Sequence, residues 1–133
     1  MTDMIRLLMV DNSYADRKLF QMLLCGGDPP WLRNVEMVSV DKPFDDVSEY
    51  ASFDGVILDY RLARGENGVD IARAIHEYNW RIPILMMTGV PEQLPQNVLT
   101  FVDRVAAKDV TLTDGFNPVD PLLVVRAWLR DIG

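Results

Sequence analysis

The centre of the chain reads Gly55-Val56-Ile57-Leu58-Asp59, a short apolar run that ends in a carboxylate. Apolar residues at consecutive positions are typical of a strand that is covered on both faces of a parallel sheet. A polar loop follows this run, and Ile71, Ile75 and Tyr78 then recur at helical spacing. The stretch therefore predicts a buried strand, a loop and an amphipathic helix.

The same strand-and-helix unit recurs on both sides of this centre. Further strands are predicted over residues 5–10, 35–40, 82–87 and 102–107, and further helices over residues 13–25, 43–52, 91–99 and 121–131. Buried strands that alternate with amphipathic helices indicate a parallel sheet with helices on both faces. We therefore expect an α/β fold with a doubly wound, five-stranded parallel sheet.

Length and composition indicate one globular domain over residues 1–133. The chain is 49% hydrophobic and 25% charged, and its net charge of −7 disfavours a nucleic-acid partner, which needs a basic face. The single cysteine, Cys25, excludes an internal disulfide framework. The apolar runs are too short to span a membrane, and Arg6 interrupts the first of them, unlike a secretory signal. We expect a cytoplasmic protein with no membrane contact.

Polar side chains follow four of the predicted strands at the points where the strands end. They are Asp11 and Asn12, Asp59, Thr88, and Lys108. Each alone has an ordinary structural explanation, such as capping a turn or lying in solvent. A parallel sheet brings all of them to one edge, where ligands of doubly wound folds bind. Carboxylates, an amide, a hydroxyl and an ammonium together suit metal-assisted phosphoryl transfer, in which an aspartate can form an aspartyl phosphate.

Three stretches carry a resemblance to a known family. They are residues 56–62 with Gly65 and residues 67–70 after them, residues 86–89, and residues 106–108. With them the sequence resembles a response regulator receiver domain of two-component signalling, over essentially the whole chain. The resemblance implies a flavodoxin-like sheet with the strand order 2-1-3-4-5, which members of this family have.

The resemblance also implies roles for individual residues. Asp59 matches the phosphoacceptor. The residues that match the Mg²⁺ site are Asp11, Asn12, Asp59 and Arg61, the last through its backbone carbonyl. The residues that match the phosphate-binding and switch positions are Thr88, Gly89 and Lys108. The implied cofactor is Mg²⁺, and the implied partner is a histidine kinase or phosphotransfer protein.

Three positions depart from the family pattern. Asn12 replaces an acidic residue that usually binds the metal, so one negative charge is lost. Val105 replaces the usual aromatic switch residue, and a valine is too short and too stiff to swing as a ring does. Asp109 replaces the proline that usually follows Lys108. The first two departures leave open a second hypothesis, that of a pseudo-receiver, a protein-interaction module that does not depend on phosphorylation.

The last predicted helix carries apolar residues on more than one side. We expect Leu122, Val125, Leu129 and Ile132 to face the sheet. A second strip consists of Leu123, Val124, Ala127 and Trp128. A helix that is apolar on two sides is either deeply buried or meets a partner. We predict that the second strip contacts a downstream protein or a second copy of the chain.

The leading functional hypothesis is a stand-alone receiver that is not a turnover enzyme and that signals through a protein-contact surface. An aspartate-nucleophile phosphatase is disfavoured, because such enzymes typically carry a second aspartate where this chain has Arg61. A flavodoxin is disfavoured as well, because residues 11–14 lack a hydroxyl-rich phosphate loop.

Overall fold

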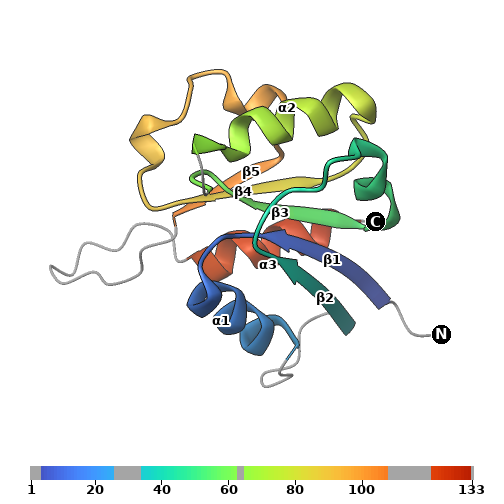
Figure 1. The fold of residues 1–133 in the computed structure, drawn as a ribbon. Helices are drawn as coiled ribbons and strands as arrows, with labels where there is room; N and C mark the ends of the chain where they lie inside the picture. The colour runs from blue at the N-terminus through green and yellow to red at the C-terminus, as the bar shows by residue number, and fades with distance from the viewer. Residues whose placement is uncertain (1–3, 26–33, 63–64, 108–120, 133) are drawn as a thin grey trace, which may run out of the picture.

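Five parallel strands form a single sheet in the order β2-β1-β3-β4-β5, as expected from the sequence (Figure 1). The strands are β1 (Met4–Val10), β2 (Asn34–Val40), β3 (Gly55–Asp59), β4 (Ile84–Thr88) and β5 (Arg104–Ala107). The structure is a computed structural model that describes residues 4–25, 34–62, 65–107 and 121–132. Consecutive apolar residues make β3 and β4 buried along their whole lengths, which is why they occupy the middle of the sheet.

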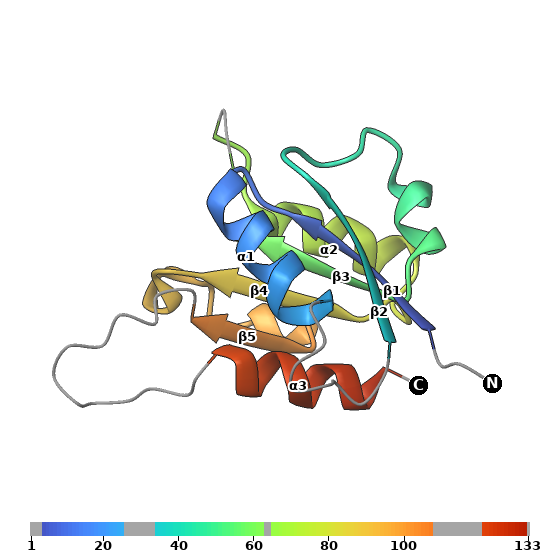
Figure 2. The same ribbon diagram turned by 90° about the horizontal axis from the view of Figure 1, so that it is seen from below.

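Helices cover both faces of this sheet. One face carries α2 (Gly68–Tyr78) with the 3₁₀ helix η1 (Val47–Ser52), and the other carries α1 (Tyr14–Cys25) and α3 (Pro121–Asp131). Figure 2 shows the sheet from the side of α1 and α3. The doubly wound architecture is therefore confirmed. Among the described residues, no helix is both long enough and apolar enough to cross a membrane.

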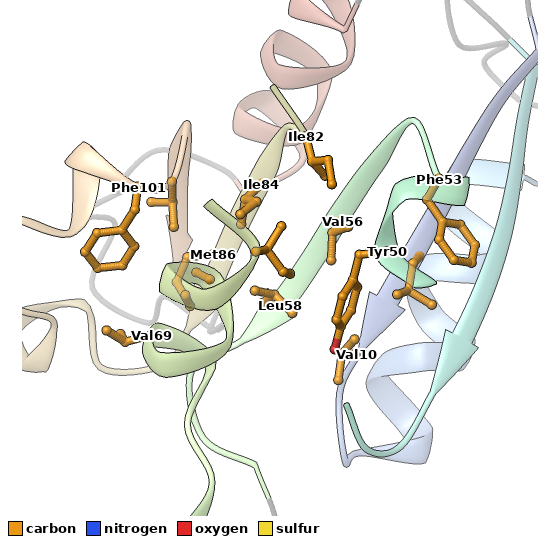
Figure 3. Packing of buried hydrophobic residues seen from close by; sticks show 14 of the residues in the cluster. Val10, Tyr50, Phe53, Val56, Leu58, Val69, Ile82, Ile84, Met86 and Phe101 are labelled. Atoms are coloured by element: carbon orange, nitrogen blue, oxygen red, sulfur yellow. The ribbon is translucent and has the colours of Figure 1, made fainter. Parts of the chain in front are cut away.

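Alternate strand residues divide the core into two halves. Leu8, Val56, Leu58 and Ile84 point toward α2 and η1, whereas Ile57 and its neighbours point toward α1 and α3. The first half also contains the rings of Tyr50, Phe53 and Phe101, which come from segments outside the strands (Figure 3). Because the sheet is buried on both sides, its open edges are the places where polar groups of the strands reach solvent.

Side-chain caps begin two of the helices. The Asp16 amide donates to Ser13 Oγ at 3.3 Å in front of α1. At α2 the Asp70 amide donates to Asn67 Oδ1 at 2.9 Å. Both caps follow directly on loops at the carboxyl ends of strands, so they fix where those loops stop.

Two of the predicted α-helices are wrong. Residues 43–52 form only the 3₁₀ helix η1, which Asp46 caps by accepting a hydrogen bond from the Ser48 amide at 3.0 Å. Residues 91–99 form no α-helix but two 3₁₀ turns, η3 (Pro91–Gln93) and η4 (Val98–Thr100). Pro95 lies between them, and a proline has no amide hydrogen for a continuous helical ladder. The described segment between β4 and β5 therefore contains no α-helix.

The predicted partner strip on the last helix is also wrong at Trp128. This side chain is fully buried and packs with Val125, Leu129 and Ile132 in the core half beneath α3. The physical reason is the helical period of 3.6 residues, which places positions 125, 128, 129 and 132 within one face about 100° wide. Val124 and Ala127 are half-buried. The Leu123 side chain lies outside the described part of the structure.

Tyr50 gives the fold a pH dependence at high pH. Burial of the ring raises the pKa of its hydroxyl, more than the hydrogen bond from the Phe44 amide at 3.0 Å lowers it. The unfolded chain has a tyrosine pKa of about 10. The free energy of unfolding should therefore fall as pH rises above about 10, because unfolding releases Tyr50 to ionise. Urea titrations of the wild type and Tyr50→Phe at several pH values would check this.

Tyr50→Phe should be less stable than the wild type by about 1 kcal/mol at neutral pH, because the Phe44 amide loses its acceptor. The difference should shrink as pH rises above about 10. A difference that stays constant over that range would contradict the assignment to Tyr50.

Candidate functional site

Three buried polar side chains lie together at the carboxyl edge of the sheet. Asp11, Asp59 and Thr88 are 0%, 6% and 1% exposed, and they are the buried polar and charged residues among those described. The register pairs Val10 with Leu58, so Asp11 and Asp59 lie across from each other, each one residue further along. Asp59 pairs in turn with Met87, next to Thr88. The predicted convergence of these three residues is confirmed.

Hydrogen bonds fix the turn that follows β1. The Asp11 amide continues the sheet by donating to the Val40 carbonyl at 3.0 Å. The Ser13 amide donates to Asp11 Oδ1 at 2.8 Å, and Arg17 Nη1 donates to the Asp11 carbonyl at 2.6 Å. Asn12 lies between these contacts and is exposed. The turn therefore holds Asp11 inward and presents Asn12 to solvent at the same edge.

A tight loop carries the chain from Asp59 into α2. The Tyr60 amide donates to the Met87 carbonyl at 2.8 Å, and the Gly68 amide returns to the Tyr60 carbonyl at 2.7 Å. Between them Arg61 pairs with Asn67 in an isolated antiparallel bridge. These contacts hold the Arg61 backbone, whose carbonyl is a predicted metal ligand, two residues beyond the predicted phosphoacceptor.

Gly68 lets the start of α2 touch the end of β3. A Cβ at this position would lie far inside van der Waals contact with the Asp59 backbone carbonyl oxygen and 3.2 Å from Met86 Sδ. Only a residue without a side chain fits, so Gly68 sets the distance between the helix and Asp59. The sequence showed Gly68 in the loop motif, but its contact with Asp59 needed the structure.

The loop that follows β4 leaves space beside the site. The Thr88 hydroxyl oxygen accepts a hydrogen bond from the Val90 amide at 3.0 Å, which leaves its own hydrogen to donate. A Cβ built at Gly89 would meet nothing within 4 Å. Lys108 lies outside the described residues. Val105 is half-buried on β5 beside the core half beneath α2.

The oxygen atoms at this edge suit a hard divalent cation. Asp11 and Asp59 supply carboxylates, Asn12 an amide oxygen and Arg61 a backbone carbonyl. Mg²⁺ binds such oxygen ligands, commonly with one or two carboxylates and several waters. Within the described ranges, no three acidic, histidine or cysteine side chains gather to form a metal site. The site therefore has the negative charge of two carboxylates, Asp11 and Asp59, rather than that of three.

Solved structures with the same fold are numerous. A response regulator receiver domain protein from Clostridium thermocellum aligns with a TM-score of 0.67 over 96% of this chain and 93% of its own, at 14% identity. The chain has the receiver-domain fold. The response regulator TrrA from Thermotoga maritima, in complex with Mg²⁺-BeF, aligns at 0.58 over 84% of this chain and 90% of its own, at 19% identity.

A third match is a complex of the histidine kinase ThkA with the response regulator TrrA, at a TM-score of 0.61 and 19% identity. It covers 97% of this chain and 99% of the matched chain. No protein-family model and no curated protein sequence matches the chain. The receiver fold is thus established by three-dimensional similarity rather than by sequence identity.

Two polar contacts at this edge of the receiver fold were absent from the sequence predictions. Arg17 holds the Asp11 carbonyl, and the Arg61 side chain donates through Nη2 to Gln93 Oε1 at 2.5 Å. Arg17 lies one turn into α1, where a cation facing the strand end could have been expected. The Arg61 contact joins residues 32 positions apart, and no local sequence signal indicates it.

Proposed function

We propose that this chain is a response regulator receiver that accepts a phosphoryl group on Asp59. The observation that supports the proposal most is the convergence of two buried carboxylates and a buried hydroxyl at the carboxyl edge of a receiver fold. A histidine kinase or phosphotransfer protein would be the donor, since one matched structure joins a kinase to its regulator. We propose a cytoplasmic location as well, as expected from the sequence.

The chemistry follows from the positions of the chain's own residues. A carboxylate oxygen of Asp59 forms a bond to phosphorus while the bond from phosphorus to the donor nitrogen breaks, and the electron pair stays on that nitrogen. The Thr88 hydroxyl donates to a phosphoryl oxygen, and the Asp11 carboxylate, held by the Ser13 amide, helps to bind the cation. Mg²⁺, when bound, would neutralise charge on the phosphoryl oxygens. The protein takes part in its own modification and is not a turnover enzyme.

Incubation with a small phosphodonor and Mg²⁺ tests the proposal. Intact-mass measurement should show the gain of one phosphoryl group in the wild type and none in Asp59→Asn. Asp54→Asn is a matched control, because Asp54 lies at the opposite end of β3 and bonds the Arg6 amide. A wild type without any gain would overturn the proposal and favour the pseudo-receiver, whose support is Asn12 and Val105.

Restoring an acid at position 12 should tighten the binding of Mg²⁺. Asn12→Asp adds a negative charge to the oxygen ligands, but Asn12 is exposed and water screens that charge. We therefore expect a decrease of about tenfold in the Kd, or about 1.4 kcal/mol. Titration calorimetry with Mg²⁺ would measure it, and Asn12→Ala, which removes the amide oxygen, should bind more weakly. An Asn12→Asp variant with unchanged affinity would contradict the role of this residue.

Signalling would pass through a contact with a downstream protein or with a second copy of the chain. Since Trp128 is buried, a contact through α3 would use the half-buried residues Val124 and Ala127. Measurement of the mass in solution with and without a phosphoryl mimic tests self-association. A monomer under both conditions would eliminate the homodimer and leave a different protein as the partner.

A further inference from the structure

The Arg61 side chain joins the two loops that flank the candidate phosphorylation site. Arg61 follows Asp59 by two residues, and Gln93 follows Thr88 by five. The hydrogen bond from Arg61 Nη2 to Gln93 Oε1 at 2.5 Å therefore bridges the carboxyl ends of β3 and β4. Both side chains are exposed, so the bond is open to competition from any group that binds a guanidinium more strongly.

From this contact we infer that Arg61 is a phosphorylation sensor that exchanges Gln93 for the phosphoryl group on Asp59. The inference rests on the proposed function. A neutral amide offers the guanidinium one acceptor oxygen, whereas a phosphoryl group offers three oxygens and a charge of about −1.5 to −2. Arginine pairs with phosphate through two parallel hydrogen bonds. Once Asp59 carries the phosphoryl group, the exchange of partners is favoured.

Release of Gln93 would act on a weakly held segment. Gln93 ends η3, and the segment of residues 91–100 is held by short-range bonds such as those from the Gln93 amide to the Val90 carbonyl and from the Val98 amide to the Pro95 carbonyl. Single 3₁₀ turns have poorer hydrogen-bond geometry than an α-helix. Segments with few such bonds open locally at low free-energy cost. Loss of the Arg61 bond should therefore loosen this segment measurably.

The loosened segment forms one wall of a surface groove. The groove has a volume of about 670 Å³, and its walls include Leu94, Pro95, Val98, Leu99, Val105 and Val124. Val105 occupies the position where the family usually has an aromatic switch residue, and a valine cannot transmit the signal in that way. The Arg61–Gln93 bond supplies a different connection, because it runs directly from the loop after Asp59 to the segment that shapes the groove.

Hydrogen exchange of the full chain, read by mass spectrometry over residues 91–100, tests the inference. Exchange in the wild type should accelerate about fivefold on phosphorylation by a small phosphodonor, the factor that one hydrogen bond gives. In Gln93→Met, residues 91–100 should exchange fast both before and after phosphorylation. In Gln93→Glu the segment should accelerate less on phosphorylation than in the wild type, because a carboxylate competes with the phosphoryl group for the guanidinium better than an amide does. Gln96→Met, a matched change outside the Arg61 bond, should behave like the wild type.

The intact mass of the same samples distinguishes the two ways of failing. In one outcome the wild type gains the phosphoryl group but the rate of hydrogen exchange over residues 91–100 does not change. This would overturn the inference that Arg61 is a sensor and would leave the proposed function unaffected. A Gln93→Met variant with the exchange of the unphosphorylated wild type overturns it as well. No gain of mass in the wild type overturns the proposed function and the sensor together.

Discussion

Gly68→Ala should destabilise the protein by about 2 kcal/mol and slow its phosphorylation. An alanine in a helix is normally stabilising by about 0.5–1 kcal/mol relative to glycine. Here the added Cβ would overlap the Asp59 backbone carbonyl oxygen, so α2 or the end of β3 must move. Overpacking of this kind typically costs about 1–3 kcal/mol, and the atom that is struck belongs to rigid backbone. The clash therefore outweighs the gain in helix propensity.

Urea unfolding and the rate of phosphoryl gain from a small phosphodonor would measure both effects. Gly89→Ala is the matched control, because its Cβ would meet nothing within 4 Å although it also lies at the carboxyl edge. We expect its stability to stay within about 0.5 kcal/mol of the wild type. A Gly68→Ala variant as stable as Gly89→Ala and as quickly phosphorylated as the wild type would show that α2 does not position Asp59.

The sheet and the convergence of the site residues could be predicted because both depend on local patterns. Consecutive apolar residues identify β3 and β4, and in a parallel sheet the residues after such strands must share an edge. Asp59 and Thr88 therefore follow from the sequence alone. The strand order came from the resemblance to receiver domains, since no local pattern specifies which strands become neighbours.

The helical predictions failed where tertiary contacts or prolines decide the conformation. Residues 91–99 contain apolar positions at helical spacing, but Pro95 removes an amide hydrogen from the middle of the ladder. In α3 the spacing of apolar residues allows two adjoining stripes, and only contact with the sheet decides which of them is buried. The Arg61–Gln93 bond has no sequence signal at all, because its geometry depends on two loops that meet across strands.

These differences change the route that we expect for a signal under the proposed function. A receiver fold with Val105 at the aromatic switch position, and with no regular helix among the described residues after β4, cannot use a ring that moves against such a helix. The chain instead has a half-buried Val105 on β5 and a pair of 3₁₀ turns tied by one side chain to the loop after Asp59. The charge that arrives on Asp59 would thus act on a guanidinium rather than through a change in ring packing.

Trp128→Ala should destabilise the fold by about 3–5 kcal/mol, the usual cost of removing a large aromatic side chain from a core. The Trp128 ring is fully buried, and its Cη2 atom lies 2.8 Å from the position that a Cβ on Gly55 would occupy. The ring therefore fills the space between α3 and the start of β3, and alanine would leave a cavity there. Chemical denaturation would measure the loss.

Trp128→Phe separates packing from the indole nitrogen. Among the described residues Trp128 Nε1 is buried with no hydrogen-bond partner, so phenylalanine removes an unsatisfied donor while it keeps most of the ring. We expect Trp128→Phe to lose much less stability than Trp128→Ala. Leu99→Ala, a change at a side chain that is 65% exposed, should stay within about 0.5 kcal/mol of the wild type. If Trp128→Ala were as stable as Leu99→Ala, the ring would not be part of the core. Trp128 would then again be a candidate residue of the partner surface predicted from the sequence.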